Sequence, residues 1–269
     1  MSSPITAEKS CSRLSTHLTY GTISHRTVFQ EAAKKRDLIK HTNKNFAKSI
    51  NSFLSRLHWR SHFIQKLEDQ PSIEHASFIP VYDQIRDKDE EKLEAWIEGK
   101  TGVHFIDACM IYLRNHGWIN FRMRAMLASF ASYNLWLDWR YFAPRLAALF
   151  TDFEPGIHYS QIQMQSGTTG INTIRMYNPY KQAMDQDPLG KFIKSQIPEV
   201  KNFPPAFFHN PPKKSLNVNL FDNEVQKEII NVKETAQYAR KKIFDIRKSQ
   251  EHKILAKNVY LKHGSRGRS

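Results

Sequence analysis

Cysteine is scarce in this sequence: only Cys11 and Cys109 occur among its 269 residues. Two cysteines exclude a framework of several disulfides and a four-cysteine iron–sulfur cluster. No apolar run approaches the ~18 residues that a membrane span requires, and the polar stretch 1–9 lacks the apolar core of a secretory signal. Hydrolase signatures are absent too, since there is no G-x-S-x-G elbow and no cysteine–histidine pair at a protease-like spacing. We therefore expect a protein of the cytoplasm that does not act in a membrane.

Positive charge is abundant. The chain has 40 Lys and Arg against 26 Asp and Glu, a formal net charge of +14. From Arg240 to the end, ten cations face only Asp245 and Glu251, so this stretch carries ten minus two, or +8. Two interpretations of it stay open: a solvated basic tail, or an extension that binds phosphates without reading sequence. The charge makes nucleic acid the leading class of partner.

Apolar residues recur at three- and four-residue steps, which predicts an all-α protein. Hydrophobic residues make up 40% of the chain and aromatic residues 12% of it, which is enough to form a core. The expected helices cover residues 46–67, 93–97 (stopped by Gly99), 106–113 (closed by Gly117), 120–139 (apolar on nearly every face) and 141–149.

The pattern fails between these helices and the C-terminal part. Residues 156–171 are rich in Ser, Thr, Gln and Gly without a clean period, which indicates a loop or a lined pocket. A final helix is predicted to begin near Asp222, whose carboxylate suits an N-cap. We expect one domain over residues 1–215 and a C-terminal helix with a basic tail over 216–269.

Two familiar motifs are set aside. Gly99-Lys100-Thr101 ends like a phosphate-binding loop, but Glu94 stands where that loop needs its first glycine and no strand precedes it. His58 and His62 share a helix face and can chelate zinc, yet no further ligand stands at a telling spacing. We expect no metal site.

Several segments combine residues with useful chemistry. Ser12-Arg13-Leu14-Ser15 offers two hydroxyls and a guanidinium ahead of a helix, which suits a phosphate. Other such groups are Trp59-Arg60, Trp118 with Arg122 and Arg124, and the acids Asp152 and Glu154. Taken singly, each of these groups is more often a structural feature than a functional one. An arginine in a buried helix, for example, needs an ion-pair partner for stability alone.

Together these segments follow a known order. They are Ser12–Ser15 with Tyr20–Ser24, Leu57–Arg60, Ala95–Gly102 with Ile106–Ala108, Gly117–Arg124, Ala128–Phe130, Leu137–Arg140, Arg175–Pro179, Asp187 and Ile197–Glu199. From about residue 10 to 215, with near-constant spacing, the chain resembles the FAD-binding helical domain of the photolyase/cryptochrome family. The match begins near residue 10, whereas the family usually has an antenna domain ahead of the flavin domain. The resemblance therefore implies either a short form without the N-terminal antenna domain or a fragment of a longer chain, and we expect no second chromophore.

The resemblance implies a role for each matching residue. Ser12, Arg13, Leu14 and Ser15 would hold the FAD pyrophosphate, assisted by Arg60 and Arg175. Arg124 and Asp152 would form an ion pair beside the isoalloxazine, with Glu154 near the ribose or the ring edge. A cation near the ring favours the anionic reduced flavin.

The implied activity is light-driven repair of DNA. Reduced FAD absorbs blue or near-ultraviolet light and passes an electron to a pyrimidine dimer, which splits and returns it. The dimer must be flipped out of the duplex to reach a buried flavin. Trp59 would stack on the lesion with Trp118 nearby, and basic residues would hold the phosphates.

The lesion pocket departs from the family pattern. Arg56 stands where a repair enzyme usually has glutamate, Phe121 where it has asparagine, and Phe53 replaces tryptophan. His158 occupies the position that faces flavin N5, commonly asparagine. Losing the carboxylate removes an acceptor and an acid, and we hypothesise that Arg56 stabilises the lesion's radical anion instead.

The electron-transfer chain departs as well. Of three tryptophans only Trp139 remains, with Ile162 and Arg86 in the other places. Light-driven reduction would then need a route through Trp136, Tyr159 or Tyr133.

Despite these departures, the resemblance favours a monomeric DNA photolyase. A cryptochrome-like photoreceptor without repair, or a basic DNA-binding remnant without flavin, remain alternatives.

Overall fold

The computed structural model describes residues 3–210 and 226–264, and in this part of the chain every regular element is helical. The α-helices are α1 (Pro4–Ser10), α2 (Ser15–Thr19), α3 (His25–Ile39), α4 (Lys44–Asp69), α5 (Glu90–Glu98), α6 (His104–His116), α7 (Phe121–Ser129), α8 (Trp139–Ala147), α9 (Pro155–Ser166), α10 (Pro179–Gln186), α11 (Lys191–Gln196), α12 (Ala206–His209), α13 (Val232–Lys248) and α14 (Gln250–His263). Short 3-10 turns cover η1 (Pro71–Glu74), η2 (Pro80–Tyr82) and η4 (Pro198–Val200), and η3 (Phe130–Asn134) is a π-helical turn. The prediction of an all-α protein is confirmed.

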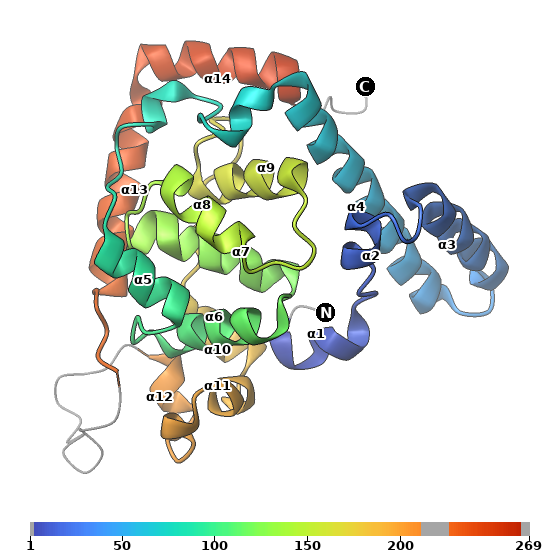
Figure 1. The fold of residues 1–269 in the computed structure, drawn as a ribbon, viewed down its shortest axis with the longest axis horizontal. Coiled ribbons are helices and arrows are strands. Elements are labelled where there is room, and N and C mark those ends of the chain that lie inside the picture. The colour runs from blue at the N-terminus through green and yellow to red at the C-terminus, as the bar shows by residue number, and fades with distance from the viewer. Residues whose placement is uncertain (1–2, 211–225, 265–269) are drawn as a thin grey trace. The chain divides into compact units, whose positions relative to one another are not determined.

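The chain divides into two compact units. The smaller unit holds residues 12–74 and 151–160. In it α3 and α4 form a helical hairpin (Figure 1), and their apolar faces meet in a core of Val28, Ile50, Leu54 and Leu57. The start of α4 is fixed locally, because the Asn43 side chain accepts a hydrogen bond from the Phe46 amide.

The larger unit holds the remaining residues. Its helix α6 packs against α5, α7, α10 and α11, and the π-helical turn η3 packs against α7, α8 and α13 (Figure 1). Trp96, Phe105 and Phe130 are among its largest fully buried side chains. Gly99 and Gly117 end α5 and α6 with φ of 72° and 62°, the left-handed conformation that favours glycine.

One expected helix is divided. The apolar segment 120–139 forms α7, then the turn η3, and only Trp139 begins α8. Trp136 lies between them with φ of 57°, a value that costs a non-glycine residue about 1–3 kcal/mol. A uniform apolar pattern predicts burial but cannot locate such a break.

The segment 156–171 was wrongly expected to lack a helix, since α9 covers Pro155–Ser166. The period is obscured because residues facing the core are polar: Gln163 and Ser166 are fully buried. The Gln163 side chain accepts from the Phe78 amide at 2.8 Å and donates to the Ala76 carbonyl at 3.0 Å. Satisfied hydrogen bonds make this burial tolerable.

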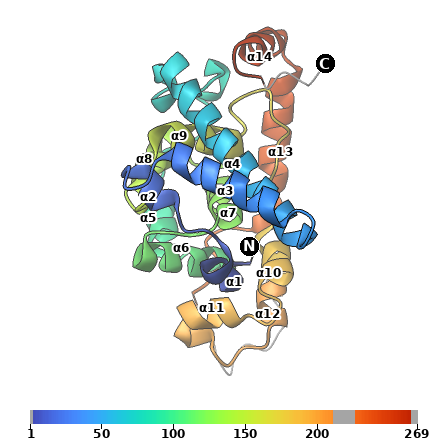
Figure 2. The ribbon, with the colours of Figure 1, turned by 90° about the vertical axis from the view of Figure 1, so that its right-hand side faces the viewer.

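The C-terminal part also differs from expectation. Asp222 lies outside the described residues, and the helix begins at Val232 with Asn231 as N-cap. The basic stretch from Arg240 onward covers the second half of α13 and a further helix, α14, which follows α13 after Ser249 (Figures 1 and 2); residues 265–269 lie outside the described residues. None of the helices in residues 3–210 and 226–264 is long and apolar enough to cross a membrane.

Candidate functional site

The segment Ser12–Ser15 has an unusual backbone. It follows α1 without regular structure, and Ser15 begins α2. Arg13 adopts φ of 56°, a region that non-glycine residues rarely occupy. Ser12 and Arg13 are exposed, while Leu14 and Ser15 are half-buried. A strained, hydroxyl-bearing segment next to a guanidinium is suited to binding an anion.

Arg60 links this segment to the acids that follow residue 150. Its Nη2 donates to Glu154 Oε2 at 3.2 Å and to the Leu18 carbonyl at 3.3 Å. The two charged side chains are only 18% and 20% exposed, so partial desolvation strengthens their attraction. The Thr19 hydroxyl donates to the Asp152 carbonyl at 3.4 Å. Within the smaller unit the predicted residues Arg60 and Glu154 thus meet, and residues of α2 contact both Arg60 and the Asp152 backbone.

Helix α9 approaches α4 closely at Gly156. A Cβ atom at Gly156 would lie 2.7 Å from Ile64 Cα and 3.2 Å from the Phe63 carbonyl oxygen. Both neighbours are backbone atoms, so only glycine fits. The contact fixes the start of α9, and with it Asp152, Glu154 and His158, against the helix that carries Arg60.

One face of α4 carries the predicted lesion-binding residues. Arg56, Trp59 and Phe63 follow at three- and four-residue steps and therefore share a face. Trp59 is 42% exposed and lies with its ring centroid 5.6 Å from Phe63 and 5.5 Å from His62. Burial, with Lys66 nearby, lowers the pKa of His62. An exposed aromatic ring beside an exposed arginine can bind a base and its phosphate.

His158 is a buried residue of α9, 9% exposed. Its amide donates to the Glu154 carbonyl, and its ring lies edge-on to Phe153 and Tyr159 at 5.3 Å and 5.2 Å. Aromatic neighbours hold the imidazole in one orientation. His58, the other member of the rejected histidine pair, packs edge-on against Phe29.

The larger unit holds the remaining predicted flavin residues. The Arg124 Nε donates to the Ile119 carbonyl at 2.7 Å, and its guanidinium lies 4.1 Å from the Phe150 ring centre. Trp118 is buried, Arg175 is exposed, and Phe121 is 54% exposed at the start of α7. Arg124 is thus oriented by its own surroundings, as a fixed charge requires.

Trp139 and Arg86 are both buried in the larger unit. Trp139 donates from Nε1 to Ser77 Oγ at 2.9 Å. Arg86 donates to the Ser132 and Ser166 carbonyls and lies 5.0 Å from the Trp136 ring; Ile162 is buried too. Trp136 contacts the half-exposed Tyr238 edge-on at 5.3 Å. The exposed Tyr238 thus connects Trp136 to the surface. Electron transfer to the flavin through Trp136 stays a prediction.

The loop after Gly99 binds a carboxylate of its own chain. Asp107 accepts from the amides of Thr101 and Gly102 and from the Thr101 hydroxyl, at 2.9, 2.8 and 2.6 Å. These amides therefore serve to close the loop between α5 and α6. Rejecting a phosphate-binding loop here agrees with the geometry.

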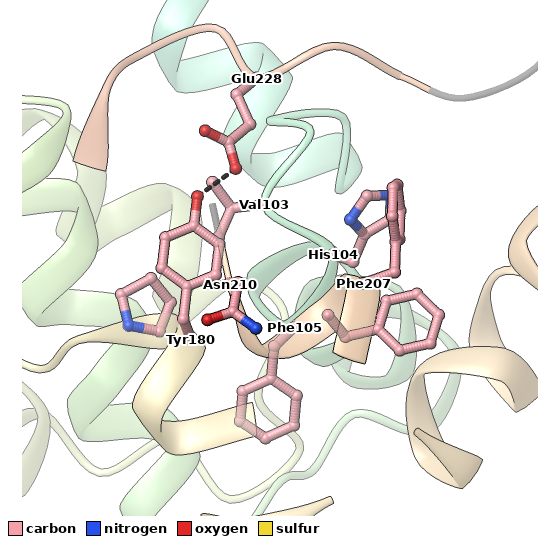
Figure 3. A pocket seen from close by; sticks show the side chains of 9 residues that line it. Val103, His104, Phe105, Tyr180, Phe207, Asn210 and Glu228 are labelled. Carbon is pink, nitrogen blue, oxygen red and sulfur yellow. Dashed lines mark hydrogen bonds between the residues drawn. The ribbon is translucent and has the colours of Figure 1, made fainter. Parts of the chain in front are cut away.

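A pocket that the sequence does not indicate lies among α6, α10 and α12 (Figure 3). His104, Phe207, Asn210, Tyr180 and Glu228 line it, and the Tyr180 hydroxyl donates to Glu228. None of the predicted site residues lines it. Among the residues that the structure describes, none is a hydrogen-bond partner of the buried His104 Nε2, and burial lowers the pKa of His104 to about 4.

His104 should therefore make stability depend on pH. Its pKa in the folded state is below 6.5, so the unfolded chain binds the proton more tightly, and stability is lost as pH falls from about 6.5 toward 4. Asp107 acts oppositely, since burial raises its pKa to about 6. The difference between wild type and His104→Phe isolates the histidine: we expect wild type to lose about 2–3 kcal/mol relative to the variant between pH 7 and 4.5, by urea unfolding. Parallel pH curves for the two proteins would contradict this.

Sequence reasoning missed two determinants of the site. Gly156 gave no signal, because its role depends on a helix 92 positions earlier, at Ile64. The Arg60–Glu154 ion pair joins residues 94 positions apart, and charge type alone does not select partners.

The chain resembles known proteins over most of its length. Residues 53–257 match the FAD binding domain of DNA photolyase. A deoxyribodipyrimidine photo-lyase of Streptomyces griseus is 30% identical over 203 residues, 75% of this chain and 42% of the relative. Cryptochrome-1 of Rattus norvegicus is 29% identical over 201 residues, covering 74% and 34%. An archaeal photolyase from Sulfolobus tokodaii, solved with two FAD molecules, superposes with a TM-score of 0.75 at 30% identity over 91% of this chain and 52% of that one. The chain thus spans less than half the length of these curated relatives.

Proposed function

Because the chain belongs to the photolyase/cryptochrome family and carries its FAD-binding domain, we propose that it acts in light-driven repair of pyrimidine dimers in DNA. The observation that carries this proposal is the cluster in the smaller unit. There the hydroxyl-bearing segment Ser12–Ser15, the Arg60–Glu154 pair and the exposed Trp59 belong to one compact body.

The donor set of this cluster suits FAD. A pyrophosphate needs cations and hydroxyl or amide donors, and Ser12, Arg13 and Ser15 supply them within four residues. FAD, when bound, supplies the light absorption and the electron transfer. Arg60, tied to Glu154, positions the phosphate-binding segment through the Leu18 carbonyl, with Leu14 packed against the apolar core.

We assign four further residues to the flavin. By the family match, Arg124 would supply a fixed positive charge that favours a reduced, anionic ring, and Asp152 would accept a hydrogen bond from the ring. His158 of α9 would contribute to the same site, and Arg175 would bind a phosphate. Trp139 is assigned to electron transfer.

The remaining assignments concern the lesion. Trp59 offers an exposed ring on which an extruded base can stack, worth about 1–3 kcal/mol. Arg56, one turn away and exposed, would bind the adjacent negative charge. Trp118, which the family match also assigns to the lesion, is a buried residue of the larger unit. Flipping is least costly for a damaged base, which favours a dimer as substrate.

A second candidate is a cryptochrome-like photoreceptor that holds flavin without repair. Arg56 and Phe121 favour it, because neither supplies the carboxylate or amide that a dimer-repair site usually presents. A third candidate is a DNA-binding remnant without flavin, which the net charge of +14 permits.

The test begins with purified protein, whose absorption spectrum reports bound FAD. With the flavin reduced chemically, near-ultraviolet light should restore normal bases in an oligonucleotide that holds one cyclobutane dimer, and the dark sample should not. Chemical reduction matters because an interrupted tryptophan chain would otherwise look like absent repair. Flavin with no repair selects the photoreceptor. Colourless protein that binds DNA selects the remnant.

The pyrophosphate assignment has its own prediction. The double variant Ser12→Ala/Ser15→Ala should weaken FAD binding roughly 10²- to 10⁴-fold, because each hydroxyl bond to a charged phosphate contributes about 1.5–3 kcal/mol. Equilibrium titration of apoprotein with FAD measures it. The matched control is Ser49→Ala/Ser52→Ala, which removes two exposed hydroxyls of α4 in the same unit and should leave binding unchanged. Equal losses in both pairs would refute the assignment.

A further inference from the structure

One exposed face of α13 carries four cations. Residues at three- and four-residue steps share a helix face, and on α13 such a set is Lys233, Gln237, Arg240, Lys241, Phe244 and Lys248, here called the α13 stripe. Every residue of the α13 stripe is exposed. Fifteen residues separate its ends, about 22 Å along the helix axis.

The opposite face of α13 is committed to the core. Val232, Ala239 and Ile243 are buried, and the latter two join a cluster with Ile79, Tyr82 and Tyr133. The helix is therefore held in place by packing within the larger unit, and the α13 stripe is available for something else. Figure 2 shows α13 as a straight helix at the side of the larger unit.

The charges of the α13 stripe are not neutralised by the protein. Lys233, Arg240, Lys241 and Lys248 form no ion pair with any residue in the described ranges. The two acids of the helix are Glu234 and Asp245, and Glu234 accepts a hydrogen bond from Asn231 at 2.9 Å. Four unneutralised cations in a row create a positive surface potential, which attracts a polyanion.

An aromatic ring stands among these cations. Phe244 is 56% exposed, and Lys248 Nζ lies 4.4 Å from its ring centre. An exposed phenyl ring costs solubility and contributes nothing to the core, whereas a ring framed by cations is the arrangement that stacks an unpaired base while its phosphates are bound. A duplex hides its base faces, so the ring favours a single strand.

We propose that the α13 stripe is a binding surface for single-stranded nucleic acid, in which the four cations bind phosphates and Phe244 stacks on a base. The surface lies on α13 and includes none of the residues assigned to flavin or lesion, and the proposal does not depend on light-driven repair. Binding of this kind would give the basic C-terminal part a function that does not depend on the base sequence of the nucleic acid.

The first experiment measures affinity in the dark for a fluorescently labelled, undamaged oligothymidylate by anisotropy, at several salt concentrations. Neutralising two phosphate contacts of a single strand should lower the slope of log affinity against log salt by about 1.4, at ~0.7 per contact. We expect this for Lys241→Gln/Lys248→Gln. The matched control, Lys191→Gln/Lys201→Gln, removes two exposed lysines elsewhere in the same unit and should leave the slope unchanged. Equal changes in the two pairs would reduce the effect to net charge and overturn the proposal.

The second experiment tests stacking. Phe244→Ala should weaken oligothymidylate binding about 5- to 100-fold and leave binding to heparin, a polyanion without bases, unchanged. Phe244→Trp should restore affinity, with tryptophan fluorescence quenched by the oligonucleotide. Loss of heparin binding in Phe244→Ala would contradict a stacking role. Because the substituted side chains are exposed, circular dichroism should show intact helices.

A lipid surface is the competing partner for lysines beside an aromatic ring. Sedimentation with phosphatidylserine–phosphatidylcholine vesicles distinguishes it. Binding to these vesicles without binding to the oligonucleotide would overturn the proposal, and binding to the oligonucleotide alone supports it. Since undamaged DNA and darkness are used, failure of repair leaves this result unaffected.

Discussion

Gly156→Val is expected to lower the free energy of unfolding by about 2–4 kcal/mol and to abolish FAD retention. The added Cβ would lie 2.7 Å from Ile64 Cα, so α9 must move away from α4. That movement separates Glu154 from Arg60, whose nitrogen and oxygen now lie 3.2 Å apart. Urea unfolding and the flavin absorption of the purified variant measure the two effects.

A second variant identifies which atoms cause the loss. The three atoms nearest the added Cβ are Ile64 Cα, the Phe63 carbonyl oxygen and the Ile64 amide nitrogen, all in the backbone. Trimming the neighbouring side chain in Ile64→Ala should therefore not rescue Gly156→Val. Full rescue, or a variant within 0.5 kcal/mol of wild type, would show that the helices do not meet in this way.

Asp107→Ala is expected to cost about 3–5 kcal/mol of stability. It leaves the amides of Thr101 and Gly102 and the Thr101 hydroxyl without their acceptor, and each unsatisfied buried donor costs about 1–3 kcal/mol. Thermal and urea unfolding measure the loss. Because burial raises the pKa of Asp107 to about 6, the folded chain binds this proton more tightly than the unfolded chain, so the wild-type advantage should be larger at pH 5 than at pH 7.

Thr101→Ser is the control for this loop. It keeps the hydroxyl that donates to Asp107 and removes one methyl group, so a loss below about 1.5 kcal/mol is expected. If Asp107→Ala cost no more than Thr101→Ser, the carboxylate would not be what closes the loop between α5 and α6.

The helices with apolar faces followed from the sequence. The helix predicted over residues 46–67 corresponds to α4 (Lys44–Asp69). Gly99 and Gly117 end their helices with φ in the left-handed region, as predicted. These features depend on neighbours within a turn or two, where hydrogen bonding and side-chain periodicity act locally. The resemblance that assigns the FAD-binding domain also rests on linear order and spacing, so the sequence carries it in full.

The site residues were only partly predictable. Their identities stand in the sequence, and Ser12–Ser15 is local enough to suggest an anion. Their partners are not local: Arg60 meets Glu154 and the Leu18 carbonyl because the smaller unit folds that way. Nothing in the sequence indicates that the Asp107 carboxylate, rather than a phosphate, accepts hydrogen bonds from the amides of the loop before it.

Sequence by itself therefore determined the helical class, the C-caps at Gly99 and Gly117, the excess of positive charge and the family. Tertiary structure alone decided that polar residues 155–166 form a helix, since buried Gln163 is stabilised by backbone groups 85 and 87 positions away. It also decided where the apolar segment breaks at Phe130–Asn134 and which face of α13 stays exposed. The physical reason is the same in each case: periodicity records which residues are apolar, whereas hydrogen bonds and packing between distant segments decide which polar residues are buried.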